Sequence, residues 1–444
     1  MVATRSTAMD TVKRPRPTPG HVAWADSEIG VIIHLDVQTF EPTYDFRQQW
    51  GITPSPEVFQ PRALDTDQWV AAARSAGATY AVLVAKHCSG FSLWPTQAHA
   101  YSVANTSWRQ GQGDIVRDFV ASCHRQGVRP GLYASASCNA FLNVDNPGVV
   151  RSGNREDQAS YNAVVEQQLT ELWTNYGELF ELWFDGGVLP PSKGGPDLPP
   201  LLLKLQPGAV VFQGPRGCPL LRWVGNERAE APYPCWSTTN TLSAADGVAE
   251  QLDLGGDPDG TIWAPAESDM PNRDQHKAFQ GGWFWRAGED QHLYSVEHLL
   301  ERYYLSVGRN SNLLLGMVID ARGLVPDADA RHFEAFGKAV RAQFATCLGR
   351  SAGHGSRLDL PLAAPGRVDS LVLMEDIAAG ERVRRYRIEG ETAAGWKTLA
   401  RGTCIGHKRI ERLTPVEVRS LSLHLEESVE PPCIREFAAY GSPA

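Results

Sequence analysis

Several protein classes are disfavoured by what the sequence lacks. No stretch reaches the roughly 18 consecutive apolar residues that a membrane-spanning helix needs. The eight cysteines are scattered without a Cys-x-x-Cys pair, which favours reduced, buried thiols over a disulfide framework or a zinc site. A net charge of -9 argues against nucleic acid or an anionic membrane as the main partner.

The first twenty residues also lack the apolar run of a secretory leader. We therefore expect a cytoplasmic protein, or a secreted or lysosomal one if a leader precedes this sequence. Nothing in the sequence indicates an oligomeric state.

The residues that are present describe a globular protein. Apolar residues make up 42% of the 444 positions and charged residues 21%, which is typical of globular chains. This length exceeds what one hydrophobic core usually supports, so we expect two domains. The thirteen tryptophans could stack on sugar rings, although large aromatic residues also fill ordinary cores.

Short apolar runs alternate with helical patterns from residue 20 to residue 346. The runs are rich in Val, Ile and Leu without alternation, as in parallel strands buried on both faces. No Gly-x-Gly-x-x-Gly turn follows the first run, which disfavours a dinucleotide-binding sheet. We therefore predict an α/β fold, a (β/α)8-like TIM barrel. Its strands are expected at residues 30–35, 79–85, 128–135, 179–185, 209–214, 220–225, 261–267 and 312–318.

The hydrophobic pattern of the sequence changes after Phe344. Residues 347–357 are predicted to form a linker, and residues 355–444 carry short alternating segments parted by Gly and Pro. This pattern predicts a small C-terminal β-sandwich. The sandwich could bind sugar or could be an appendage that packs on the barrel.

Polar residues gather where the predicted barrel strands end. The carboxyl ends of parallel strands meet at one face of a barrel, so these side chains are expected to form a pocket. Each of these residues alone has an ordinary structural explanation. For example, an Asp before two glycines is commonly a turn residue. The set comprises His34, Asp36, Lys86, His87, Tyr133, Ser135, Asp185, Asn226, Glu227, Glu267 and Asp269.

Two reaction classes fit such a pocket. Two carboxyl groups can cleave a glycosidic bond, one as nucleophile or general base and the other as general acid. Alternatively, His34, His87 and Asp185 could be ligands of a metal-dependent hydrolase. That class typically carries a His-x-His pair on one strand, and none of the twelve histidines forms one.

The motifs resemble those of the α-L-fucosidases of glycoside hydrolase family 29. The likeness runs from about Ala23 to Phe344 and rests on "GVIIHL", "AKHCSGFSLWPT", "GDIVRDFVASCHRQGVRPGLYAS" and "ELFELWFDGG". The segments "RWVGNE", "WAPAESD", "GGWFW" and "SVGRNSNLLLG" are similar to the subfamily that prefers branched α-1,3/1,4-linked fucose. The resemblance implies a (β/α)8-like barrel followed by a β-sandwich.

The resemblance also implies an activity and its residues. The expected reaction is the retaining release of α-L-fucose from fucosylated oligosaccharides, without a cofactor or metal. Asp185 matches the family nucleophile and Glu227 the acid/base of the branched-linkage subfamily, with Glu267 and Glu230 as alternatives. The residues expected to bind substrate are His34, His87, Tyr133, Glu267 and Trp283.

Two positions depart from the family pattern. The family usually reads Lys-His-His-Asp-Gly-Phe, whereas this chain has Cys88 and Ser89 at the two central positions. Cysteine is a poor hydrogen-bond donor, so one sugar contact of the family is lost. "HLD" also stands where His-Trp-Gly is common. These changes leave open a catalytically weak barrel that binds fucosylated glycans.

Overall fold

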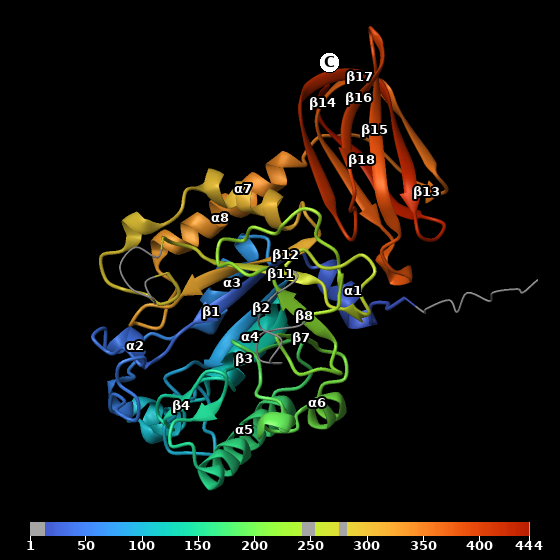
Figure 1. Ribbon diagram of the computed structural model, residues 1–444. Helices are drawn as coiled ribbons and strands as arrows, with labels where there is room; N and C mark the ends of the chain where they lie inside the picture. The colour runs from blue at the N-terminus through green and yellow to red at the C-terminus, as the bar shows by residue number, and fades with distance from the viewer. Residues whose placement is uncertain (1–13, 242–253, 275–281, 444) are drawn as a thin grey trace, which may run out of the picture.

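The computed structural model describes residues 14–241, 254–274 and 282–443, which form a closed barrel and an antiparallel sheet domain (Figure 1). Strand β1 pairs with β2 on one side and with β12 on the other, which closes the ring. The predicted parallel barrel is confirmed. Its strands are β1 (Ile29–His34), β2 (Tyr80–Lys86), β3 (Arg129–Ala134), β6 (Glu181–Trp183), β7 (Val210–Phe212), β8 (Leu220–Trp223), β11 (Ala266–Pro271) and β12 (Ser311–Val318).

Helices cover the outside of the barrel (Figure 1). Helix α3 begins where the Asp65 side chain accepts hydrogen bonds from two backbone N–H groups, and α4 ends at Gly127, whose φ of 69° favours glycine. The helices are α1 (Pro19–Ala25), α2 (Val37–Phe40), α3 (Thr66–Ser75), α4 (Ile115–Gln126), α5 (Arg155–Asn175), α6 (Pro199–Leu205), α7 (Val296–Ser306) and α8 (Asp327–Gln343). None of these described helices combines the length and apolar character that a bilayer crossing requires.

Short elements fill the connections between the barrel strands. Two small hairpins are formed by β4 (Val144–Asp145) with β5 (Val149–Val150) and by β9 (Thr238–Thr239) with β10 (Ile262–Trp263). Single 3₁₀ turns lie at Pro56–Val58, Val103–Asn105, Trp108–Gly111, Pro191–Lys193 and Asp290–His292, and one more, Ile377–Ala379, lies in the C-terminal domain.

The seventh barrel strand lies later in the chain than the sequence predicts. Residues Ile262–Trp263 belong to the β9–β10 hairpin, and the barrel strand β11 begins only at Ala266. The prediction of a strand at 261–267 was wrong because the true strand, "AESDMP", has little apolar character. Glu267 and Asp269 therefore lie inside β11, two residues apart and on the same face.

The interior of the barrel is built in layers by side chains two residues apart. Along β6 and the residues after it, Glu181, Trp183 and Asp185 point to one face in succession. The Trp183 ring stacks on Tyr133 at a centroid distance of 5.2 Å and on Phe212 at 4.0 Å. This aromatic layer separates Glu181, below it, from Asp185, above it.

The C-terminal domain is one continuous antiparallel sheet of order β13-β18-β14-β17-β15-β16. Its strands are β13 (Cys347–His354), β14 (Arg357–Glu375), β15 (Val383–Thr392), β16 (Gly395–Gly402), β17 (Arg409–Ser428) and β18 (Cys433–Pro443). The predicted linker was wrong, because Cys347–His354 pairs with β18 as part of this sheet. The sheet curves over a separate core that includes Leu371, Tyr386 and Phe437 (Figure 1).

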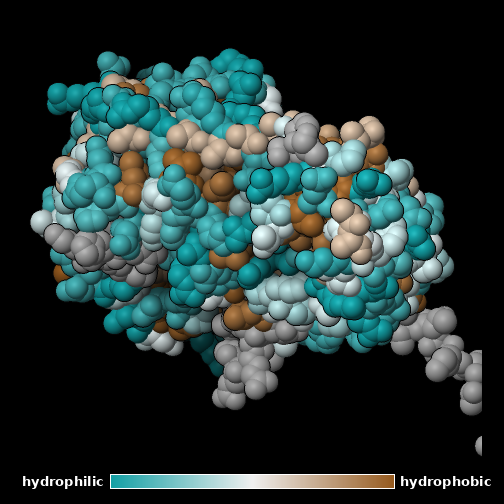
Figure 2. All heavy atoms as spheres, turned by 90° about the horizontal axis from the view of Figure 1, so that it is seen from above, coloured by the Kyte–Doolittle hydropathy of each residue, from teal (hydrophilic) through white to brown (hydrophobic). Residues whose placement is uncertain are grey.

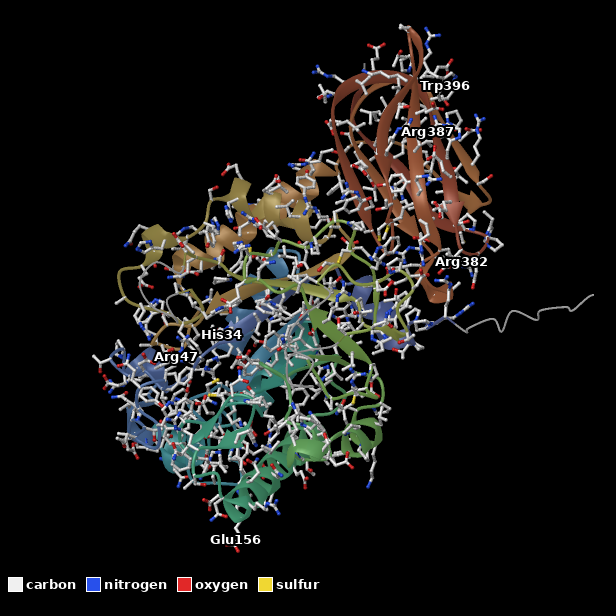
Figure 3. All side chains as sticks on the ribbon, viewed as in Figure 1. His34, Arg47, Glu156, Arg382, Arg387 and Trp396 are labelled. Atoms are coloured by element: carbon white, nitrogen blue, oxygen red, sulfur yellow. The ribbon has the colours of Figure 1, made fainter. Side chains whose placement is uncertain are left out.

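The sheet domain packs on the barrel through both apolar and polar contacts, and Val372, Ile410 and Tyr440 of the sheet belong to the barrel's hydrophobic core. Arg412 makes two hydrogen bonds to the Glu301 carboxylate on α7, at 2.6 and 3.0 Å. Figure 3 shows Trp396 near the far tip of the sheet, well away from His34 in the barrel. Seen from above, the surface is mostly hydrophilic, with apolar side chains in scattered groups (Figure 2).

Candidate active site

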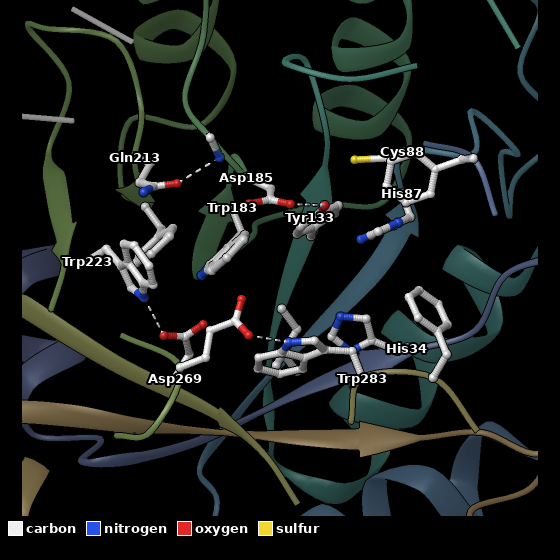
Figure 4. A pocket seen from close by; sticks show the side chains of 16 residues that line it. His34, His87, Cys88, Tyr133, Trp183, Asp185, Gln213, Trp223, Asp269 and Trp283 are labelled. Carbon is white, nitrogen blue, oxygen red and sulfur yellow. Dashed lines mark hydrogen bonds between the residues drawn. The ribbon is translucent and has the colours of Figure 1, made fainter. Parts of the chain in front are cut away.

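A pocket opens at the carboxyl ends of the barrel strands and encloses about 880 Å³ of atom-free space, mouth included (Figure 4). Its size and its mixture of apolar walls with a few polar groups suit a small ligand. The aromatic lining consists of Phe46, Tyr133, Trp183, Phe212, Trp223, Trp283 and Phe284. The polar lining consists of His34, His87, Cys88, Asp185, Gln213, Glu227 and Asp269.

Asp185 is fixed in this pocket by its own strand and by its neighbours. It lies two residues beyond the end of β6, and the Tyr133 hydroxyl donates a hydrogen bond to its Oδ2 at 3.1 Å. The N–H of Gly186 donates to Oε1 of Gln213 at 2.9 Å. Gly186 has a φ of 68°, and a Cβ there would approach Asn146 to 2.8 Å, so glycine is required. The carboxylate is therefore held rigidly toward the pocket.

The surroundings of Asp185 change its ionisation. Burial raises the pKa of this carboxyl above its usual value, the Tyr133 hydroxyl lowers it, and the charge of Glu227 raises it. Asp185 and Glu227 line the same pocket, where the charge of one acts on the other.

Glu227 reaches the pocket from the loop after β8. Its side chain is exposed, and the indole N–H of Trp283 donates a hydrogen bond to its Oε2 at 3.0 Å. Trp283 itself lines the pocket beside His34, with ring centroids 5.1 Å apart (Figure 4). The site thus joins one half-buried carboxyl group with one that is open to solvent.

The two histidines line the wall beside Asp185. His34 ends β1 and His87 follows β2, and burial lowers the pKa of each to about 3. Both rings are therefore neutral at physiological pH, and each can donate one hydrogen bond and accept another. That capacity matches the hydroxyl groups of a sugar.

Two glutamates named by the sequence lie outside the pocket lining. Glu267 is fully buried, and it accepts hydrogen bonds from the Tyr80 hydroxyl at 3.0 Å and from the Trp183 indole at 2.9 Å. It lies beneath the aromatic layer and supports it. Glu230 forms ion pairs with Arg302 on α7 and with Arg228.

Two polar residues of the pocket, Asp269 and Gln213, were not predicted to be catalytic or substrate-binding, although Asp269 was expected among the polar residues at the strand ends. Asp269 is 5% exposed and accepts a hydrogen bond from the Trp223 indole at 2.6 Å. Burial raises its pKa well above the usual range, as does the charge of Glu227. Gln213 comes directly after β7, at the carboxyl end of a barrel strand. That position in the sequence could have identified it as a pocket residue.

The comparisons with known proteins agree with this geometry. A sequence profile described as Alpha-L-fucosidase matches residues 22–343. The chain belongs to the alpha-L-fucosidase family. Alpha-L-fucosidase 1 of Arabidopsis thaliana is 30% identical over 477 residues, which cover 96% of this chain and 87% of that protein.

Solved structures extend the likeness to the whole chain. A Bacteroides thetaiotaomicron protein assigned as an alpha-L-fucosidase is 36% identical, with a TM-score of 0.90, and the match covers 97% of this chain and 100% of that one. A glycoside hydrolase 29 family member from a rumen bacterium is 29% identical, with a TM-score of 0.80 over 97% of this chain and 78% of that one. Barrel and sheet domain together thus match alpha-L-fucosidases.

Ser89 and the "HLD" segment, which both depart from the fucosidase family pattern, contact each other. The Ser89 hydroxyl donates a hydrogen bond to Oδ1 of Asp36 at 2.8 Å, and Ser89 also accepts one from the N–H of Phe91. Asp36 in turn caps α2, and burial raises its pKa to about 7. Asp36 and Ser89 therefore form a local support behind the wall, whereas Cys88 lines the pocket.

The metal-ligand set suggested as an alternative is not the one that the fold assembles. Among the residues that the structure describes, the three potential ligands that converge are His87, Cys88 and Asp185. His34 is not part of that group.

Proposed function

We propose that this member of the alpha-L-fucosidase family is a retaining hydrolase that removes α-L-fucose from branched α-1,3/1,4 linkages. The observation that carries the proposal is the pairing of Asp185 with Glu227 in one pocket, with Tyr133 orienting the first and Trp283 contacting the second. A two-step displacement uses two carboxyl groups that face one sugar, one as the nucleophile and the other as the acid/base.

In the first step, Asp185 attacks the anomeric carbon of fucose as the bond to the leaving oxygen breaks. Glu227, in its protonated form, gives its proton to that oxygen. In the second step, the Glu227 carboxylate takes a proton from water, and the water oxygen displaces Asp185. Two inversions at the same carbon give net retention.

The other pocket residues hold the sugar during both steps. The neutral rings of His34 and His87 hydrogen-bond to fucose hydroxyls, and the Trp283 ring packs against the apolar face of the sugar. Glu227 stands on the exposed side of the pocket, where the rest of a branched oligosaccharide can extend into solvent. This placement and the "RWVGNE" motif support the linkage preference.

Fucose release tests the proposal. Wild type and Asp185→Ala are incubated with a 4-nitrophenyl α-L-fucoside and with a branched fucosylated trisaccharide. We expect wild type to release fucose from the trisaccharide more efficiently than from the aryl glycoside, and Asp185→Ala to release it from neither. Preference for the aryl or a linear substrate would contradict the linkage assignment.

A glycan-binding barrel without turnover is the second candidate, and the Cys88 and Ser89 positions motivate it. Folded wild type that binds the trisaccharide but releases no fucose would establish it.

A further inference from the structure

Three side chains of different chemistry converge in the wall of the pocket. One ligand atom each of His87, Cys88 and Asp185 lies within 4.8 Å of the other two. Figure 4 shows the Cys88 sulfur and the His87 ring on the side of the pocket toward Asp185. Cys88 lines the pocket although only 6% of its surface is exposed.

His87 is prepared to act as a ligand. Its Nδ1 is buried and makes no hydrogen bond to any residue that the structure describes. The ring is oriented by a near-parallel stack on Tyr133, with centroids 5.8 Å apart, and by an edge contact with Phe284.

The ligand set selects a class of ion. Imidazole nitrogen, thiolate sulfur and carboxylate oxygen are the ligands of Zn²⁺, whereas Mg²⁺ and Ca²⁺ prefer oxygen alone. Ligand atoms around tetrahedral zinc stand roughly 3.4–3.7 Å apart. Side-chain movements of about 1 Å would therefore bring the three ligand atoms into this geometry. Three protein ligands leave a fourth position for water.

We propose that His87, Cys88 and Asp185 bind a thiophilic divalent cation such as Zn²⁺, and that the bound ion inhibits the enzyme. On binding, the metal–sulfur bond forms as the thiol proton of Cys88 is released to solvent, while Asp185 donates an oxygen lone pair to the metal. That oxygen can then no longer attack the anomeric carbon. The inhibition rests on the proposed role of Asp185, whereas metal binding does not.

Binding is tested without any turnover. Cd²⁺ bound by a thiolate gives an ultraviolet charge-transfer band. Cys433 lies 3.8 Å from His354 at the surface and could bind Cd²⁺ separately, so Cys433→Ser is the reference protein. We expect one Cd²⁺ per chain to produce the band in Cys433→Ser, and Cys88→Ser in that background to abolish it. An unchanged band would overturn the assignment.

Cys138 supplies the matched control. Its Sγ is 4.0 Å from the backbone oxygen of Cys88, yet it is not among the three converging ligands. Cys138→Ser in the same background should therefore keep the band. If Cys138→Ser lost the band and Cys88→Ser kept it, the thiolate ligand would be Cys138, and the proposal would be overturned. Thermal melting shows whether each variant is folded.

Inhibition is tested on fucose release from the aryl glycoside. We expect Zn²⁺ to inhibit Cys433→Ser and Mg²⁺ to have no effect, and Cys88→Ser to raise the inhibitory Zn²⁺ concentration at least tenfold, on the order of the loss for a metal-site residue. Activation by Zn²⁺ would overturn the inhibitory role and favour metal-dependent hydrolysis. Absence of fucose release with a normal Cd²⁺ band would contradict the proposed function and leave the metal site standing.

Discussion

The barrel contains two pairs of carboxyl groups, and strand β6 positions one member of each. Glu181 and Glu267 are fully buried beneath the Trp183 ring, whereas Asp185 and Glu227 line the pocket above it. Burial and the charge of Glu267 raise the pKa of Glu181 in the interior. Burial and the charge of Glu227 likewise raise the pKa of Asp185 in the pocket. Perturbed ionisation therefore does not by itself distinguish the pair in the pocket from the pair in the interior.

Access to the pocket does distinguish them. Glu267 accepts hydrogen bonds from Tyr80 and Trp183, and no substrate can reach it past the aromatic layer. Two buried carboxylates cannot both be ionised at low cost, so the interior pair retains a proton and acts as a hydrogen-bonded brace. Asp185, two residues beyond Trp183, is free to contact a ligand.

Replacing Asp185 should have the largest effect on activity. We expect Asp185→Asn to lower kcat/KM by at least about 10⁴-fold, as the loss of a nucleophile does. Because the pKa of Asp185 is raised in the folded state, its ionisation lowers stability as pH rises through that pKa. The variant should thus melt no lower than wild type at pH 7, and a lower melting temperature would attribute the activity loss to misfolding.

Glu227→Ala should separate substrates by their leaving groups. Natural oligosaccharides need a proton on the departing oxygen, so their kcat/KM should fall by about 10²–10⁴-fold. Activated aryl fucosides need little acid assistance and should lose much less, with partial rescue by azide. Equal losses on both substrates would assign the acid/base role to another group, such as Asp269.

Glu267→Ala should act on stability. Truncation leaves the Tyr80 hydroxyl and the Trp183 indole without their acceptor, which should lower the free energy of unfolding by about 2–4 kcal/mol. Glu267→Gln keeps an acceptor and the side-chain volume, so chemical denaturation should show a smaller loss. A folded Glu267→Gln as inactive as Asp185→Asn would place Glu267 in the chemistry and erase the distinction between the pairs.

Tyr133→Phe should give the smallest change. The phenylalanine ring keeps the stack on Trp183 but loses the hydrogen bond to Asp185, which stabilises the carboxylate. The pKa of Asp185 should then rise, and the acidic limb of the kcat/KM profile should move to higher pH, with about a tenfold loss of rate. An acidic limb that stays in place would show that another group controls it.

The parts of the fold and the site that could be predicted from the sequence are those with a strong local pattern. The apolar runs before His34, His87 and Asp185 predicted strands correctly and thereby placed these residues at one face of the barrel. Strand β11 was misplaced because its polar residues give no strand signal, and the inward position of Glu267 was lost with it. The Ser89–Asp36 hydrogen bond joins residues 53 positions apart, and no local pattern encodes it.

Trapping the covalent intermediate tests the central claim most directly. A 2-deoxy-2-fluoro-α-L-fucosyl donor with a good leaving group slows the second step, so the sugar remains on the nucleophile. The account predicts an intact-protein mass increase of one fluorofucosyl group, located by peptide mapping on Asp185. A label on Glu227 or Asp269, or turnover with inverted product and no label, would contradict it.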